Sequence, residues 1–165
     1  MRTKYHEQLD DYDRTLVAMA QLVREAMVRA TDALLNADLG VAESVISDDK
    51  EVDRLYADLE ARSLQLVALQ APVATDLRGL ISGLSILASL ERMGDLAMHL
   101  AKLARLRYPN SAVPPELRGV VTEMGEVADR IVARTAEVLA SRDVPGALDL
   151  EVMDDEMDSL HIDLF

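Results

Sequence analysis

The stretch LDDYDRTLVAMAQLVREAMVRATDALLNA, residues 9–37, contains neither proline nor glycine, and its apolar side chains recur at alternating steps of four and three residues. This spacing places the apolar side chains on one face of a helix, as in a heptad seam. The segment 5–37 is therefore predicted to be one long helix with a buried face. The seam consists of Leu9, Tyr12, Leu16, Met19, Val23, Ala26, Ala30, Ala33 and Ala37.

Two further long helices follow from the same reasoning. Asp38 and Gly40 predict a turn in which Asp38 caps the second helix, and residues 71–76 predict a short connection to a third helix that ends near Tyr108. Helices of about thirty residues are about 45 Å long, and such short connections make them antiparallel neighbours. The predicted fold class is all-α, beginning with a three-helix bundle. The two added stripes are Val45, Val52, Leu59 and Leu66, then Leu77, Leu80, Leu84, Leu87, Met98 and Ala101.

Composition narrows the possible partners. Thirty acidic against 17 basic residues give a net charge of −13, which repels nucleic acid and anionic lipid. The chain has no cysteine, which fits a reducing compartment and removes disulfides and thiolate chemistry. The first residues contain no apolar segment, and no window approaches 18 uninterrupted apolar residues. We therefore expect a cytoplasmic protein without a signal peptide or membrane insertion, and no direct binding to nucleic acid.

The sequence also contains an internal repeat. A shift of 105 residues aligns positions 19–60 with 124–165 without a gap. The predicted organisation is a three-helix bundle in 1–108, a proline-rich linker in 109–115, and, in 116–165, the first helix and most of the second helix of a second bundle. The third helix of that bundle is missing, so we expect the chain to be a fragment of a protein roughly 210 to 220 residues long. The matched pairs include Met19 with Met124, Arg29 with Arg134, Asp38 with Asp143 and Leu59 with Leu164.

Carboxylates stand where apolar residues are expected. Glu91 lies on the third helix's apolar stripe, seven residues after Leu84, with Asp95 one turn further on. Asp49 and Asp53 repeat this spacing on the second helix. Two carboxylate pairs facing each other would suit a hard cation such as Mg²⁺, Mn²⁺, Ca²⁺ or iron. The weaker candidate ligands are Asp154 and Asp158 at the matching places of the second unit, and His99 one turn after Asp95.

A plainer interpretation competes with the metal site. Glu91 could form ion pairs with Arg92, Arg78 or Lys102, and the aspartates could lie on a solvated face, because acidic helices produce the E-x-x-x-D spacing freely. Catalytic chemistry has little support: the sequence lacks a phosphate-binding glycine-rich loop, an H-E-x-x-H zinc motif and an evident hydrolase triad. From the residues alone, the carboxylates could form either a metal site or part of a solvated surface.

Two motifs resemble those of the PhoU-like phosphate-uptake regulators. The run Gln70-Ala71-Pro72-Val73-Ala74-Thr75-Asp76-Leu77-Arg78 resembles that family's Q-x-P-x-A-x-D-L-R motif, and Leu90-Glu91-Arg92-Met93-Gly94-Asp95 resembles its E-R-[IM]-G-D signature. The resemblance implies two tandem three-helix bundles, often dimeric, that bind metal ions through E-x-x-x-D motifs. It places the first such motif on Glu91 and Asp95, with Asp49 and Asp53 as neighbouring acidic candidates. Arg92 and Arg78 would orient the carboxylates or form ordinary ion pairs.

The resemblance also implies a function. PhoU-like proteins are non-enzymatic negative regulators of the phosphate-starvation response, linking a phosphate ABC transporter, through its nucleotide-binding subunit, to a sensor histidine kinase. We therefore expect a cytoplasmic homodimer that reaches the inner face of the membrane through its partners and carries a divalent or iron-type metal ion. The alternatives are a metal-dependent enzyme built on the carboxylates and a purely structural helical adaptor.

Overall fold

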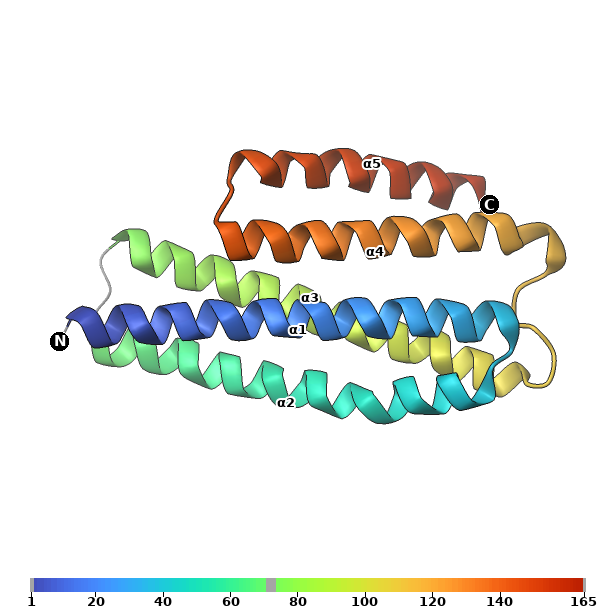
Figure 1. Cartoon of the computed structure of the whole chain (residues 1–165), viewed down its shortest axis with the longest axis horizontal. Helices are drawn as coiled ribbons and strands as arrows, with labels where there is room; N and C mark the ends of the chain where they lie inside the picture. The colour runs from blue at the N-terminus through green and yellow to red at the C-terminus, as the bar shows by residue number, and fades with distance from the viewer. Residues whose placement is uncertain (1, 71–73, 165) are drawn as a thin grey trace.

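The computed structural model describes residues 2–70 and 74–164, with side chains for 5–68 and 76–164. Within these residues the chain forms five α-helices, and the all-α prediction is confirmed (Figure 1). Short 3₁₀ turns, η1 (Pro115–Leu117) and η2 (Pro145–Ala147), precede the last two helices. The predicted connection 71–76 includes 71–73, which lie outside the described residues. The helices are α1 (Arg2–Asn36), α2 (Leu39–Gln70), α3 (Ala74–Arg107), α4 (Arg118–Ser141) and α5 (Leu148–Asp163).

Helices α1, α2 and α3 lie along one another as long neighbours (Figure 1). Most of the predicted seam residues are buried, and Met19 and Val23 of α1 are fully enclosed. Full burial of one such side chain contributes about 1.5 to 3 kcal/mol, so the bundle is held mainly by these apolar faces. The buried members of the second and third stripes are Val45, Val52, Leu59, Leu66, Leu80, Leu87 and Ala101.

The turn between α1 and α2 follows the sequence expectation. Ala37 adopts a left-handed conformation with φ of 52°, and the Asp38 amide donates a hydrogen bond to the Ala33 carbonyl at 3.1 Å. The Asp38 carboxylate then accepts a hydrogen bond from the Val41 amide at 2.9 Å, which confirms Asp38 as the predicted cap. After α4 the chain turns in the same way at Arg142, where φ is 54°, 105 residues after Ala37.

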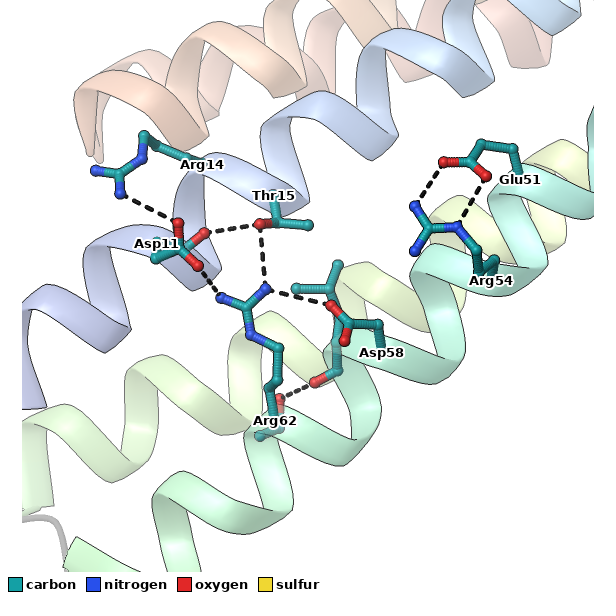
Figure 2. A network of polar contacts seen from close by, with 9 residues as sticks. Asp11, Arg14, Thr15, Glu51, Arg54, Asp58 and Arg62 are labelled. Atoms are coloured by element: carbon teal, nitrogen blue, oxygen red, sulfur yellow. Dashed lines mark hydrogen bonds and ion pairs between the residues drawn. The ribbon is translucent and has the colours of Figure 1, made fainter.

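Polar contacts tie α1 to α2 outside the apolar seam (Figure 2). Arg62 of α2 donates hydrogen bonds to Asp11 of α1 at 2.5 Å and to Thr15 at 3.3 Å. It also contacts Asp58, one turn back on its own helix. This arginine therefore fixes the register of the two helices near the end of the bundle where α1 begins.

Helix α4 packs antiparallel along α1 rather than forming a separate core (Figure 1). Its Val132 and Ala136 belong to the same apolar cluster as Met19, Ala20 and Val23 of α1. Helix α4 is thus stabilised by burying its apolar face against α1.

The polar contacts between α1 and α4 have a two-fold pattern. At the centre, Arg24 donates two hydrogen bonds to Asp129, at 2.5 and 3.0 Å, and these positions are 105 residues apart. Toward one end Arg142 binds Asp13 at 2.6 Å, and toward the other Arg118 binds the Leu35 carbonyl. Arg142 and Arg118 lie 105 residues after Ala37 and Asp13. The two outer contacts therefore occupy exchanged positions, to within two residues on α1, about an axis through the Arg24–Asp129 pair.

Helix α5 packs on α4 and its preceding turn, and on no other helix within the described residues. Its apolar side chains Met157 and Leu160 are partly or fully buried. Ion pairs reinforce this contact at Arg134 with Asp149, 2.7 Å apart, and Arg130 with Glu156, 2.6 Å apart. Because α5 has one neighbour, most of its surface faces solvent.

Gly125 allows the close approach of α4 to α1. A Cβ atom there would lie 2.7 Å from Thr31 Cγ2, and the Thr31 hydroxyl is held by a hydrogen bond to the Met27 carbonyl. We predict that Gly125→Val lowers the free energy of unfolding by about 1 to 3 kcal/mol through overpacking. Urea unfolding measures the change. Gly119→Val is the matched control, since no atom lies within 4 Å of its Cβ position, and equal destabilisation by both would contradict the packing argument.

The Arg24–Asp129 pair predicts that the stability of the fold depends on pH. The hydrogen bonds from Arg24 hold the pKa of Asp129 below its usual value. A carboxyl whose pKa is lowered by folding stabilises the fold above its unfolded pKa, about 3.9, and loses that contribution as the pH falls through the lowered folded value. Asp129→Asn is expected to destabilise the protein at neutral pH and to have a smaller effect at an acidic pH below the lowered folded pKa.

Urea unfolding at the two pH values tests this expectation. Asp154→Asn on the exposed part of α5 serves as a control, with little expected effect at either pH. A deficit for Asp129→Asn that stays constant with pH would show that the ion pair is not its source.

Candidate functional site

The candidate site lies where α2 and α3 pack together. Gly94 of α3 lets the helices approach closely, because a Cβ atom there would lie 3.1 Å from Val52 Cγ1 and 3.7 Å from Asp49 Oδ1. Gly94 directly precedes Asp95, and Glu91 lies one turn before Asp95. The helix contact that Gly94 permits therefore brings the carboxylates of α3 toward those of α2.

The electrostatics of the site are those of crowded like charges. The pKa of Asp49 is raised, first by its partial burial and then by the negative charges of Asp53 and Asp95. The pKa of Glu91 is also raised, by partial burial and by the charges of Asp95, Asp53 and Asp49. The negative charges of the predicted carboxylates thus act on Asp49 and Glu91 across the α2–α3 contact.

Two positive groups border this cluster. Lys102 and His99 of α3 act on Asp49 and oppose the increase in its pKa. The plainer sequence interpretation named Lys102 as one of three possible partners of Glu91 instead. The signal that could have placed it correctly is its spacing of seven residues from Asp95, which keeps it on the same face of α3.

The expected arginine partners do not take part. Arg78 and Arg92 are exposed, and neither forms an ion pair within the described residues. The ion pairs of Glu91 with Arg92, Arg78 or Lys102 that the plainer interpretation offered are therefore absent among the described residues. The other half of that interpretation, aspartates on a solvated face, agrees with the exposure of Asp53, Asp154 and Asp158. Among the described side chains Glu91 has no ion-pair partner.

The predicted ligands of the second unit lie apart from this cluster. Asp154 and Asp158 are exposed on α5, which packs on α4 and not on α2 or α3 within the described part of the chain. Nor do three or more histidine, aspartate or glutamate side chains among the described residues converge as a ready metal site. The α2–α3 carboxylates are neighbours whose oxygen donors suit a hard cation, but the side chains do not form a closed set.

No helix among the described residues is both long and apolar enough to span a lipid bilayer.

Comparisons with known proteins identify the fold and its family. A family model described as the PhoU domain matches residues 16–104, more than half of the chain. The chain is 47% identical, over its whole length and 78% of the relative's, to the phosphate-specific transport system accessory protein PhoU homolog 2 of Mycobacterium tuberculosis. It is 30% identical, over 98% of its length and 67% of the relative's, to the PhoU homolog of Zymomonas mobilis.

Two solved structures share the fold. The crystal structure of PhoU from Pseudomonas aeruginosa aligns with a TM-score of 0.88 and 27% identity, covering 94% of this chain and 74% of that one. The phosphate transport system regulatory protein PhoU from Streptococcus pneumoniae aligns with a TM-score of 0.86 and 26% identity, covering 97% and 74%.

The fold and these matches define a helical accessory or regulatory protein of phosphate transport, not an enzyme. The chain belongs to the PhoU family.

Proposed function

We propose that the protein is a negative regulator of phosphate uptake and of phosphate-starvation signalling. In this function it links the nucleotide-binding subunit of a phosphate ABC transporter to a sensor histidine kinase on the cytoplasmic side of the membrane. The observation that supports this most is the 47% identity, over the whole chain, to an accessory protein of phosphate-specific transport. The long helical surfaces of the bundle suit an adaptor, whose function is to present contact faces.

We further propose that Glu91, Asp95, Asp49 and Asp53 bind a hard divalent or iron-type cation. Their mutual repulsion, expressed in the raised pKa values of Asp49 and Glu91, supports this, because a cation would relieve it. Rotation of the four side chains toward the α2–α3 contact would close the set, with His99 beside it. The bound ion would neutralise the cluster and join α2 to α3.

The homodimer and the purely structural alternative, both expected from the sequence, stay predictions. A homodimer is expected from the family resemblance alone. The other alternative is a purely structural adaptor whose carboxylates bind nothing. A metal titration separates it from a regulator with a metal site, because the structural adaptor would show no binding at these carboxylates.

Calorimetric titration of the full chain with Mn²⁺ tests the metal site. We predict measurable binding that is weakened at least about tenfold in the double variant Glu91→Gln/Asp95→Asn, which removes two anionic ligands. Asp154→Asn/Asp158→Asn is a matched control, since it neutralises a pair of the same spacing on α5. Equal loss in both double variants would mean that the ion binds through general acidity. No loss in the first would remove Glu91 and Asp95 as ligands.

Deletion of the gene in its host bacterium tests the regulatory function. We predict raised phosphate uptake and raised kinase output in high phosphate, both restored by the wild-type chain. Uptake of radiolabelled phosphate and a reporter of the phosphate-starvation response measure the two outputs. If both outputs stay at their wild-type level after deletion, the regulatory proposal fails, whatever the metal titration gives.

A further inference from the structure

Helix α5 presents a second apolar face, directed away from α4. Leu148, Val152 and Ile162 are 68%, 70% and 74% exposed. Their spacing places them within a sector of about 80° on a helix, along about 21 Å of its length. We call these three residues the α5 outer stripe. The opposite side of α5 carries the residues that are buried or partly buried toward α4, namely Leu150, Met153, Met157, Leu160 and Leu164.

A third helix packed on the second unit, as α3 packs on α2, would not cover this stripe. The positions of α2 that lie 105 residues before the stripe are Glu43, Ser47 and Ala57, and all three are exposed. Helix α2 meets α3 through a different side, where Val52 and Asp49 approach Gly94. The apolar residues of the stripe therefore stand where the first unit has residues that face solvent.

Acidic side chains surround the stripe. Residues 143–165 contain eight aspartates and glutamates and neither lysine nor arginine. Asp149 and Glu156 are paired with arginines of α4. Others have no such partner, since no lysine or arginine among the described residues forms an ion pair with Glu151, Asp155 or Asp158. By helical spacing, Asp155 lies within the stripe and Glu151 and Asp158 lie along one edge.

We propose that the α5 outer stripe is a docking surface for a cationic amphipathic helix of a partner protein. Apolar side chains of such a helix would contact Leu148, Val152 and Ile162, while its lysines and arginines would pair with the flanking carboxylates. A second copy of α5 would bring like charges together, and anionic lipid would be repelled. The proposal rests on the adaptor function proposed above, and it adds the chemistry of one partner surface.

A synthetic helical peptide provides the test. The probe is a peptide with leucines at alternating steps of three and four residues and lysines on both flanks, and its matched control has glutamate in place of every lysine. We predict that the full chain binds the lysine peptide, that added salt weakens this binding, and that the glutamate peptide does not bind. Binding is measured by fluorescence anisotropy of the labelled peptide.

Variants of the full chain locate the binding. The triple variant Leu148→Ser/Val152→Ser/Ile162→Ser is expected to weaken binding at least about tenfold, because three apolar contacts are lost. Glu151→Gln/Asp155→Asn is expected to reduce both the affinity and its dependence on salt. Leu106→Ser is the matched control, since Leu106 of α3 is 79% exposed and lies on another helix. Thermal unfolding of each variant checks that the fold is retained.

Several outcomes would overturn the proposal. These are no binding of the lysine peptide, equal binding of the glutamate peptide, or an unchanged affinity in the triple variant. A dimer that dissociates on introduction of the triple variant, seen by analytical ultracentrifugation, would assign the stripe to a second copy of the chain instead. None of these results depends on the phosphate-uptake phenotype, so this proposal and the regulatory proposal can fail separately.

Discussion

The structure depends on the burial of α1 on more than one side. This helix packs against α2, α3 and α4, and Met19, Ala20, Val23, Ala30 and Ala33 lose all contact with solvent. Such burial supplies the main stabilisation in a protein that has no disulfide and whose ion pairs are mostly exposed. Among the described helices α4 packs on α1 and α5 and on no other, so its position depends on its contact with α1. The position of α5 depends in turn on α4.

Much of this architecture could be predicted from the sequence, because the breaks in the chain are sharp. The turn at Asp38 and the proline-rich segment after Tyr108 divide it into long uninterrupted helices, and the heptad stripes identify the faces that meet. The second buried side of α1 was missed. Ala20, Met27 and Leu34 form another stripe at seven-residue spacing, in apolar clusters that include residues of α4. Assigning one apolar stripe to each helix assumes that each helix has one buried face. Helix α1 lies between other helices and has two.

The candidate site, like the fold, could be predicted only in part. Helical spacing was enough to place Glu91 with Asp95 and Asp49 with Asp53, and the contact at Gly94 brings the two pairs into mutual repulsion. Spacing could not determine side-chain rotamers, which leave the carboxylates without a closed set of three. It also could not show that Arg78 and Arg92 stay exposed, because long charged side chains have many alternatives on a helix surface. The arrangement of the side chains in such a cluster depends on the positive charge that neutralises it.

The Arg24–Asp129 pair has a consequence for how the two halves of the chain recognise each other. On a two-fold axis between identical subunits, each residue meets its own copy, so an arginine would face an arginine and an aspartate an aspartate. Here the residues that meet at the centre of the α1–α4 contact are 105 positions apart and carry opposite charges. Joining both halves in one polypeptide permits this asymmetry. It also favours each half's attachment to the other over self-pairing, since two copies of α1 or of α4 would place like charges in contact.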